Sequence, residues 1–382
     1  MQTKFSVFQD TWNHKLDGSL DSPNTLVIIF GPSKLDDVAK GLDDVIQAFP
    51  QSLIMGASSA GEILHDELIE NSLVVSVVKF EDTNLTLTQH AITDTKDSFD
   101  GGMSIAEELF TPELKAIFVL SDGLNVNGSQ FTKGINSVLP SNIPVTGGLA
   151  ADDDRFEKTW VIVDGKPAQG YITALGLYGD RIQIKHGSKG GWDKLGVSRE
   201  VTKSSANILY ELDNQPALEI YKKYLGSQAE GLPGTGLLFP LSLEEKGSKN
   251  EAKVRTILAV NEQDQSITFA GDIPLGSSVT LMKANYDRLV DGAENAAKEM
   301  LLNDYKDENS LCIAISCVGR RLVLKQRIEE ELEATLDVLP KNVKQVGFYS
   351  YGEISPLASG KCDLQNQTMT LTLLWESNAS PT

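Results

Sequence analysis

Apolar residues in this chain follow two spacings, which predict buried strands and amphipathic helices. Residues 26–30 form an unbroken apolar run that predicts a buried strand, and a glycine and a proline end it. From Leu35 to Phe49 the apolar residues recur at helical spacing and form one face. A second apolar run, at residues 311–316, is followed by a helical segment that ends at Pro340. These patterns predict an α/β protein with mixed sheets and strand–helix–strand units.

A glycine-rich stretch follows each of these strand–helix units. Residues 56–63 and residues 347–354 both read G-x-x-S-x-G-E-I. After each stretch a polar segment leads into another strand-like run, at residues 73–80 and at residues 369–375. Because the elements follow in the same order at both ends of the chain, we predict two related lobes.

The middle of the chain contains a third glycine-rich strand end and the predicted boundary between the lobes. The strand end lies at residues 146–154 and follows another strand–helix unit. Helical spacing returns in residues 206–225 and is interrupted at Pro216. We therefore predict three parts: an N-terminal lobe of residues 24–205, a C-terminal lobe of residues 206–376, and a disordered tail of residues 377–382.

Length and charge narrow the classes of partner. A chain of 382 residues is long enough for two domains. The net charge of −19 disfavours binding to nucleic acids or to an anionic membrane, because phosphate groups would be repelled. No apolar run approaches the roughly 20 residues that span a bilayer, and the N-terminus does not resemble a signal peptide. The expected location is the cytoplasm, and the oligomeric state stays open.

The cysteines and histidines do not match metal-binding or disulfide patterns. Cys312, Cys317 and Cys362 form an odd set without C-x-x-C spacing, which disfavours a zinc site and a disulfide framework. Cys312 lies in an apolar run and is expected in the core. The four histidines share no H-E-x-x-H or similar spacing, which disfavours a catalytic zinc held by the protein alone.

Small polar residues and glycines gather at the predicted carboxyl ends of strands. In open α/β sheets ligands bind beyond these ends, and glycine allows a backbone to approach a ligand closely. The sequence therefore predicts a ligand cleft there; the other interpretation is that the glycines only satisfy turns. The predicted cleft residues are Ser59, Gly61, Glu62, Gly147, Gly148, Ser350, Gly352 and Glu353.

Glu62 and Glu353 hold matching places in the two repeated stretches. If the lobes face each other, the two carboxyl groups would lie across one cleft and act as an acid–base pair, with Cys317 as a further catalytic candidate. The alternative is that each glutamate caps a turn or helix in its own lobe. Because no nucleophile elbow and no phosphate-binding loop are present, we predict that the protein is not an enzyme.

One histidine has surroundings that suit a haem. An axial histidine requires no motif, only a pocket with an apolar wall. Glycines leave space around His186, and Trp192 would supply a flat apolar face, whereas His65 is the second choice of iron ligand. A histidine satisfied by loop backbone groups is the other interpretation. Arg320, at a predicted strand end, would bind a ligand carboxylate or haem propionate, or form a surface ion pair with Glu329 or its neighbours.

Six segments together resemble the FIST family of sensory domains, in order and spacing. They are residues 56–63, 145–153, 186–196, 216–226, 316–320 and 347–356. The resemblance covers about residues 24–376 and implies a FIST N-type lobe over 24–205 and a FIST C-type lobe over 206–376.

The resemblance also implies a function. The family is thought to bind small ligands, amino acids among them, and to signal to partner proteins. This chain resembles a stand-alone member, and some of those use a b-type haem to sense nitric oxide and regulate a separate histidine kinase. We therefore expect a haem-based nitric-oxide sensor. The alternative expectations are a haem-free sensor of amino acids or other small ligands, and an enzyme that acts on a small substrate in the cleft between the lobes.

Overall fold

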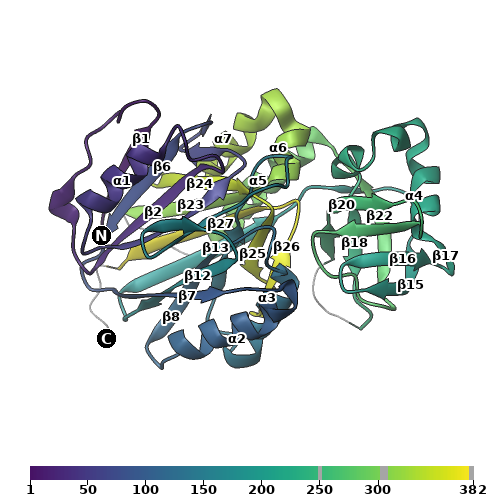
Figure 1. Cartoon of the computed structure of the whole chain (residues 1–382), viewed down its shortest axis with the longest axis horizontal. Helices are drawn as coiled ribbons and strands as arrows, with labels where there is room; N and C mark the ends of the chain where they lie inside the picture. The colour runs from purple at the N-terminus through teal and green to yellow at the C-terminus, as the bar shows by residue number, and fades with distance from the viewer. Residues whose placement is uncertain (248–251, 302–308, 378–382) are drawn as a thin grey trace.

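The computed structural model describes residues 1–247, 252–301 and 309–377. These residues form a body of three six-stranded sheets and a smaller β domain that stands at one end of the body (Figure 1). The body is built from three units with the same order of elements. The smaller domain interrupts the third unit and is called the inserted β domain below.

The first unit occupies residues 2–79 and the second unit residues 84–178. The elements of the first unit are β1 (Gln2–Phe8), β2 (Thr25–Pro32), α1 (Ala39–Ala48), β3 (Leu53–Ser59), β4 (Glu62–Leu64), β5 (Glu67–Ile69) and β6 (Leu73–Lys79). Those of the second are β7 (Asn84–Ala91), α2 (Ser98–Leu109), β8 (Leu114–Ser121), α3 (Gly128–Val138), β9 (Val145–Leu149), β10 (Val161–Val163), β11 (Lys166–Ala168) and β12 (Tyr171–Tyr178).

The third unit comprises residues 182–189 and 286–376. Its elements are β13 (Ile182–Lys189), α5 (Tyr286–Met300), β23 (Ser310–Cys317), α6 (Val318–Leu324), α7 (Ile328–Val338), β24 (Lys344–Ser350), β25 (Gly352–Pro356), β26 (Cys362–Gln365) and β27 (Met369–Glu376).

The inserted β domain holds residues 193–283 and has its own hydrophobic core. Its elements are β14 (Asp193–Lys194), β15 (Arg199–Ser205), β16 (Ile208–Leu212), β17 (Gln215–Pro216), α4 (Ala217–Leu225), β18 (Leu241–Glu244), β19 (Lys253–Arg255), β20 (Ile257–Asn261), β21 (Ser266–Phe269) and β22 (Ser278–Lys283).

The three units share one topology and exchange hairpins in a ring. In each unit two parallel strands are joined through a helix, as parallel pairing requires. The strand that returns to the sheet pairs antiparallel with the first of them. Between these steps the chain leaves its own sheet as a short hairpin: β4–β5 joins the sheet of the third unit, β25–β26 that of the second, and β10–β11 that of the first. Each hairpin covers an edge of the neighbouring sheet, which ties the units together.

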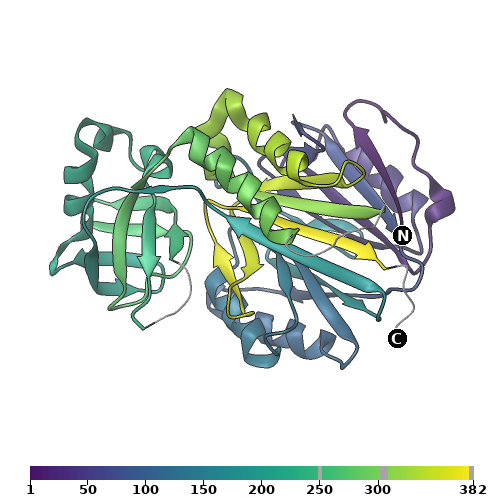
Figure 2. The same ribbon diagram turned by 180° about the vertical axis from the view of Figure 1, so that it is seen from behind.

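The three sheets face a shared core. The rings of Phe30 on β2 and Phe348 on β24 stack there, with centroids 4.6 Å apart, and Phe118 of β8 lies in the same cluster. Burying each aromatic side chain contributes roughly 1.5–3 kcal/mol. The helices cover the outer faces of the sheets, α1 on the first, α2 and α3 on the second, and α5 to α7 on the third (Figures 1 and 2).

The predicted α/β class with mixed sheets is confirmed, and the repetition extends to a third unit. The two G-x-x-S-x-G-E-I stretches begin within β3 and β24 and continue into β4 and β25, and the third glycine-rich stretch begins within β9. The proposed boundary at residues 205 and 206 falls in the turn between β15 and β16, which pair with each other. Of the predicted tail, Ser377 is described, and its N–H donates to the carbonyl oxygen of Arg181 at 2.8 Å; residues 378–382 lie outside the described residues.

Two local predictions were wrong. The helical spacing expected over residues 206–225 is a helix only after Pro216, as α4. Before Pro216 the chain forms strand β16, because two tight turns flank it; Asp213 and Asn214, for example, both have the positive φ angles of a two-residue hairpin turn. His186, which one interpretation placed in a loop, lies within strand β13, because β13 pairs with β27 along its whole length to Lys189.

Candidate functional site

The carboxyl ends of strands from all three units meet in a ring of backbone hydrogen bonds. The bonds run from Ala60 N to Tyr349 O at 2.9 Å, from Tyr351 N to Leu149 O at 3.1 Å, and from Ala151 N to Ser58 O at 2.9 Å. The Arg321 side chain connects the same three units, because it donates to the carbonyl oxygen of Ala60 and to the carboxylates of Asp153 and Glu70. The strand ends are therefore held in one rigid arrangement.

The first strand end is closed by Glu62, whose side chain is 1% exposed. The hydroxyl group of Ser59 donates to one carboxyl oxygen of Glu62, and the hydroxyl group of Ser72 donates to the other at 3.3 Å. Burial raises the pKa of Glu62 to about 8, although the serine hydrogen bonds act in the opposite direction.

The third unit repeats this arrangement at Glu353, which is fully buried. The hydroxyl group of Ser350 donates to Glu353 at 2.7 Å, and that of Thr368 donates at 2.8 Å. Burial again raises the pKa of the carboxyl group to about 8. Each glutamate is thus bound by hydroxyl groups of its own unit, as in the capping alternative.

The predicted cleft glycines serve the backbone of the sheets. A Cβ atom at Gly147 would overlap the carbonyl oxygen of Val119 on the neighbouring strand, and Gly61 has a φ of +117°. Cβ atoms at Gly148 and Gly352 would meet the side chains of Ile315 and Leu364 at 2.8 and 2.7 Å. These four glycines are buried and allow close packing at the ring.

The strand end of the second unit lacks the Ser–Glu pair. In the strand register Val161 takes the place of Glu62 and Glu353, because it pairs with Ala57 as they pair with Phe348 and Gly148. Counting from the first glycine of each stretch, Ala150 takes the place of the serine. The sealing arrangement is therefore absent from this strand end, which we call the open corner.

Two buried aspartates occupy the open corner. Asp122 follows β8 and accepts hydrogen bonds from the N–H groups of Leu124 and Gly170, at 2.8 and 2.7 Å, and from the Thr159 hydroxyl group at 2.9 Å. Asp152 follows β9 and accepts hydrogen bonds from the N–H groups of Phe156, Glu157 and Lys158 and from the Tyr351 hydroxyl group. These donors are neutral, and they fold the loop between β9 and β10 around the Asp152 carboxylate.

A cavity of about 180 Å³ lies at the open corner, between the body and the inserted β domain. The body contributes the loop from β8 to α3 with the α3 cap Asn127, and also Leu149, Phe156 and Tyr351. The inserted β domain contributes Asn207, Leu258, Phe269 and Ala270. This position, beyond the carboxyl ends of parallel strands, is where α/β proteins commonly bind ligands.

An aromatic pair forms one wall of this cavity. The rings of Phe156 and Tyr351 stack with centroids 4.6 Å apart and an interplanar angle of 13°. Phe156 is 37% exposed and has a φ of +53°, an uncommon backbone conformation for a bulky residue. Its N–H is bound by Asp152 at 2.9 Å, so the strained conformation is held by the loop.

Beside the cavity the inserted β domain is attached to α3 through one carboxylate. Asp272 accepts hydrogen bonds from Asn127 at 3.3 Å and from Gln130 at 2.5 Å, and Lys133 forms an ion pair with it at 2.9 Å. Burial would raise the pKa of Asp272, but Lys133 and the amide donors lower it overall. Asn127 thus belongs both to the cavity wall and to this attachment.

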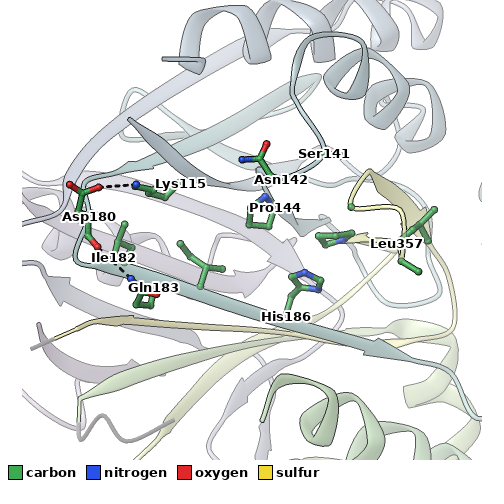
Figure 3. Close-up of a pocket in the computed structure, with 13 residues that line it drawn as sticks. Lys115, Ser141, Asn142, Pro144, Asp180, Ile182, Gln183, His186 and Leu357 are labelled. Atoms are coloured by element: carbon green, nitrogen blue, oxygen red, sulfur yellow. Dashed lines mark hydrogen bonds and ion pairs between the residues drawn. The ribbon is translucent and has the colours of Figure 1, made fainter. Parts of the chain in front are cut away.

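The predicted haem ligand His186 lies elsewhere, on β13 in a groove of about 570 Å³ (Figure 3). Ile182, Ile184 and Leu357 are apolar residues that line the groove. Ile182 lies toward the far end, near the ion pair between Lys115 and Asp180 (Figure 3). Burial lowers the pKa of His186, which favours the neutral imidazole.

The other two predicted haem contacts are not in this groove. The Trp192 indole is buried and donates to the Gln367 carbonyl oxygen at 2.9 Å. Arg320 is fully buried, and its five N–H groups donate to Glu331 and to the carbonyl oxygens of Gly190, Leu289 and Gln367. Arg320 therefore connects elements inside the protein and is not available to a haem propionate.

The remaining candidates are likewise separate from the open corner. His65 lies on the surface in the turn after β4, and its ring meets that of Phe5 edge-on with centroids 5.7 Å apart. Cys312, Cys317 and Cys362 are buried, and burial raises the pKa of each thiol. Among the described residues no group of three or more His, Cys, Asp or Glu side chains suits a metal ion, and none of the described helices could cross a membrane.

Sequence reasoning missed the residues that line the cavity. Tyr351 stands inside the second repeated stretch, at a variable position, and Leu149 belongs to the third glycine-rich strand end. Phe156, Asn207 and Phe269 carry no comparable signal, because only the docking of the inserted β domain brings them together.

Comparison with protein families decides the relationship. The FIST N domain matches residues 25–215, and the FIST C domain matches residues 217–356. The chain belongs to the FIST family. FIST domains are sensor domains of signal transduction, which supports a sensory, ligand-binding role for this FIST protein.

One sequence relative adds no information on the function of this FIST protein. An uncharacterized protein of Methanocaldococcus jannaschii, MJ1623, is 27% identical over 243 residues, which are 55% of this chain and 45% of the relative. The FIST protein thus spans less than half the length of that relative.

Two solved structures resemble it weakly. Cyanuric acid hydrolase from A. caulinodans has 9% identity and a TM-score of 0.18, and covers 78% of this chain and all of its own. PurLQS from Thermotoga maritima has 10% identity and a TM-score of 0.17, and covers 95% of this chain and 68% of its own. Neither likeness is close enough to inform fold or function.

Proposed function

We propose that this FIST protein senses a small molecule bound in the cavity at the open corner. The observation that carries the proposal is that both the body and the inserted β domain line this cavity. A ligand there contacts both parts at once, so its affinity depends on how they are docked. Differential affinity of this kind is what a ligand needs to shift a conformational equilibrium.

The signal would pass through Asn127. Its side chain lines the cavity and also donates to Asp272, which attaches the inserted β domain to α3. A ligand that hydrogen-bonds to Asn127 competes with or reinforces this attachment. The arrangement of the inserted β domain then becomes the output that a partner protein, such as a histidine kinase, reads in trans.

A cavity-filling variant tests this proposal. The full chain is screened against small metabolites, the amino acids included, by thermal shift, and hits are confirmed by calorimetry. Ala270→Leu places a larger side chain in the cavity at a half-buried position, so we expect the protein to stay folded and to lose ligand affinity by tenfold or more. Thr268→Leu, at another half-buried position of the same strand region, is the control. Ligands that bind the Ala270→Leu variant as tightly as the unchanged protein would contradict the proposal.

The signalling part has its own test. Autophosphorylation of the candidate kinase is measured with and without the FIST protein, in the presence and absence of the ligand. We expect the ligand to change the effect of the FIST protein on the kinase. Identical kinase activity in all four mixtures would refute this part alone.

Haem in the His186 groove is the second candidate. The groove has about 570 Å³, and the neutral imidazole favoured by burial is the form that binds iron. His186 would hold the iron and Ile182, Ile184 and Leu357 would contact the ring, whereas Trp192 and Arg320 are engaged elsewhere. A bound haem would supply the site for nitric oxide.

Absorption spectroscopy separates the two candidates. Haem is titrated into the protein, and the sample is reduced and exposed to nitric oxide. A saturable Soret band that shifts with nitric oxide and is lost in His186→Ala supports haem sensing, with His65→Ala as the control variant. A band of equal strength in both variants, or none, removes this candidate.

We also propose that signalling, not catalysis, is the role of the chain. Glu62 and Glu353 are enclosed by their own serine and threonine partners, and burial keeps Cys317 in its thiol form. Turnover of a bound ligand that is abolished in Glu62→Gln would overturn this.

A further inference from the structure

We infer that the cavity at the open corner takes a small aromatic compound that carries an amine and no carboxylate. This deepens the proposed function, because it rests on that cavity being the ligand site. The inference follows from three independent features of the cavity. They are the residue types that line it, the carboxylates hydrogen-bonded to the lining residues, and the backbone conformation of Phe156.

The lining offers ring faces and neutral polar groups. Phe156, Tyr351 and Phe269 are aromatic, Asn127, Asn207 and Thr95 are neutral hydrogen-bonding residues, and the rest are aliphatic side chains or glycine. No charged side chain stands among the described residues that line the cavity. A ligand carboxylate would therefore lose its hydration without gaining a cationic partner, which is costly.

The charges directly behind the wall are negative. Asp122 binds the N–H of Leu124, and Asp152 binds the N–H of Phe156 and the hydroxyl group of Tyr351, so each carboxylate is one hydrogen bond away from a lining residue. Both aspartates are buried, where solvent screens their fields least.

Three nearby cations pair with other carboxylates: Arg155 and Arg321 with Asp153, and Lys133 with Asp272. The buried Arg255, beside Gly271, donates instead to the carbonyl oxygens of Val254, Asp272 and Leu364. Asp122 and Asp152 are held by neutral donors, so the potential in the cavity favours a cation and disfavours an anion.

The Phe156 side chain is partly exposed and can stack on an aromatic ligand. One face of its ring packs on Tyr351, yet 37% of the side chain stays exposed, and three N–H bonds from its loop to Asp152 hold it in a left-handed conformation. Strain of this kind persists where the surroundings enforce it, commonly at binding sites. An aromatic face beside buried carboxylates suits the ring and the ammonium group of an aromatic amine.

Three probes of matched shape test the ligand class in the full chain. Calorimetry compares 2-phenylethylamine, 2-phenylethanol and phenylacetate. We expect the amine to bind at least tenfold more tightly than phenylacetate, with the neutral alcohol between them. Phenylacetate binding as tightly as the amine, or no binding of the amine, would overturn the inference.

Variants assign the effect to the wall and to the charges. Phe156→Ala is expected to weaken the amine and the alcohol alike by tenfold or more, whereas Phe110→Ala, which changes a similarly exposed phenylalanine at the end of α2, leaves both unchanged. Asp152→Asn is expected to weaken the amine severalfold and to spare the alcohol. Because Asp152 also holds its loop, Asp122→Asn provides the same comparison at a second position, and thermal melts establish that each variant is folded. Equal loss for amine and alcohol in both variants would contradict the role of charge.

Failure of this inference differs from failure of the proposed function. If phenylacetate or another anion binds best and Ala270→Leu abolishes that binding, the cavity remains the ligand site and only the ligand class is wrong. If no compound shows binding that depends on Ala270, the cavity itself is not the site.

Discussion

The two closed strand ends and the open corner are built on the same topology but are finished differently. At the closed ends a serine donates a hydrogen bond to a glutamate three residues later, and a hydroxyl group from the residue just before the returning strand donates a second one. At the open corner Ala150 and Val161 stand in their places, and Asp122 and Asp152 organise the loops instead. The cavity lies at this third position.

This comparison indicates that different copies of one repeated unit serve stability and ligand binding. Two strand ends are sealed by polar groups that satisfy one another, so they contribute to the rigidity of the ring. The third strand end lacks this arrangement and is covered by the inserted β domain. One copy of the unit therefore borders the cavity, whereas the other two contribute to stability.

The largest expected effect comes from a feature that all three strand ends share. Gly56, Gly147 and Gly347 each lie so close to the neighbouring parallel strand that a Cβ atom would overlap a carbonyl oxygen. Gly147→Ala would push β9 away from β8, and its φ of +150° adds strain, so we expect a loss of about 4 kcal/mol or more in the free energy of unfolding. Urea denaturation measures this. Gly234→Ala, where nothing lies within 4 Å, is the control and is expected to change little.

An intermediate effect on stability is expected when a glutamate is placed in the open corner at the position equivalent to Glu62 and Glu353. Val161 is fully buried, and Gly170 stands where the closed ends have their hydroxyl donors, so Val161→Glu buries a carboxyl group without partners. We expect a loss of about 3 kcal/mol in the free energy of unfolding. Adding Ala150→Ser should recover part of it. Val163→Glu, at a half-buried position of the same strand, should cost far less; equal losses at both positions would show that the strand ends are not distinguished by their partners.

A smaller, pH-dependent effect separates the closed ends from the rest of the molecule. Glu62 and Glu353 have folded-state pKa values of about 8, above the ordinary 4.5, so between these values the folded state holds protons that the unfolded state has released. Their contribution to stability is complete below pH 4.5 and is lost as the pH rises toward 8. Each group contributes a slope of at most about 1.4 kcal/mol per pH unit.

The double variant Glu62→Gln, Glu353→Gln removes this slope because the amide does not ionise. Urea denaturation at pH 5.5, 6.5 and 7.5 should show the wild type losing stability relative to the variant as the pH rises. Parallel curves for the two proteins would show that the glutamates are ionised in the folded state. The difference between the proteins cancels other titrating groups such as His186.

The sequence predicted two equivalent strand ends, but none of the residues predicted for the ligand cleft lines the cavity at the open corner. The repeated stretch identified Ser59, Glu62, Ser350 and Glu353 as equivalent, and the structure places them equivalently. The repeat did not distinguish a shared cleft from two separate polar clusters, because hydrogen-bond partners such as Thr368 lie outside the repeated stretch. Arg320 illustrates the same limit: a strand-end arginine suits a ligand carboxylate, yet its partners arrive from α5 and α7.

The amino-acid sequence by itself determined the α/β class, the strand–helix–strand units and the glycine-rich strand ends, because hydrophobic period and glycine content report local conformation. Only the tertiary structure decided that three units exchange hairpins in a ring, and that a separate β domain covers one strand end. These outcomes depend on which surfaces pair across large sequence separations. Leu149, Phe156, Asn207 and Phe269 meet in one cavity for that reason. Periodicity identifies a buried face, but not the partner that buries it.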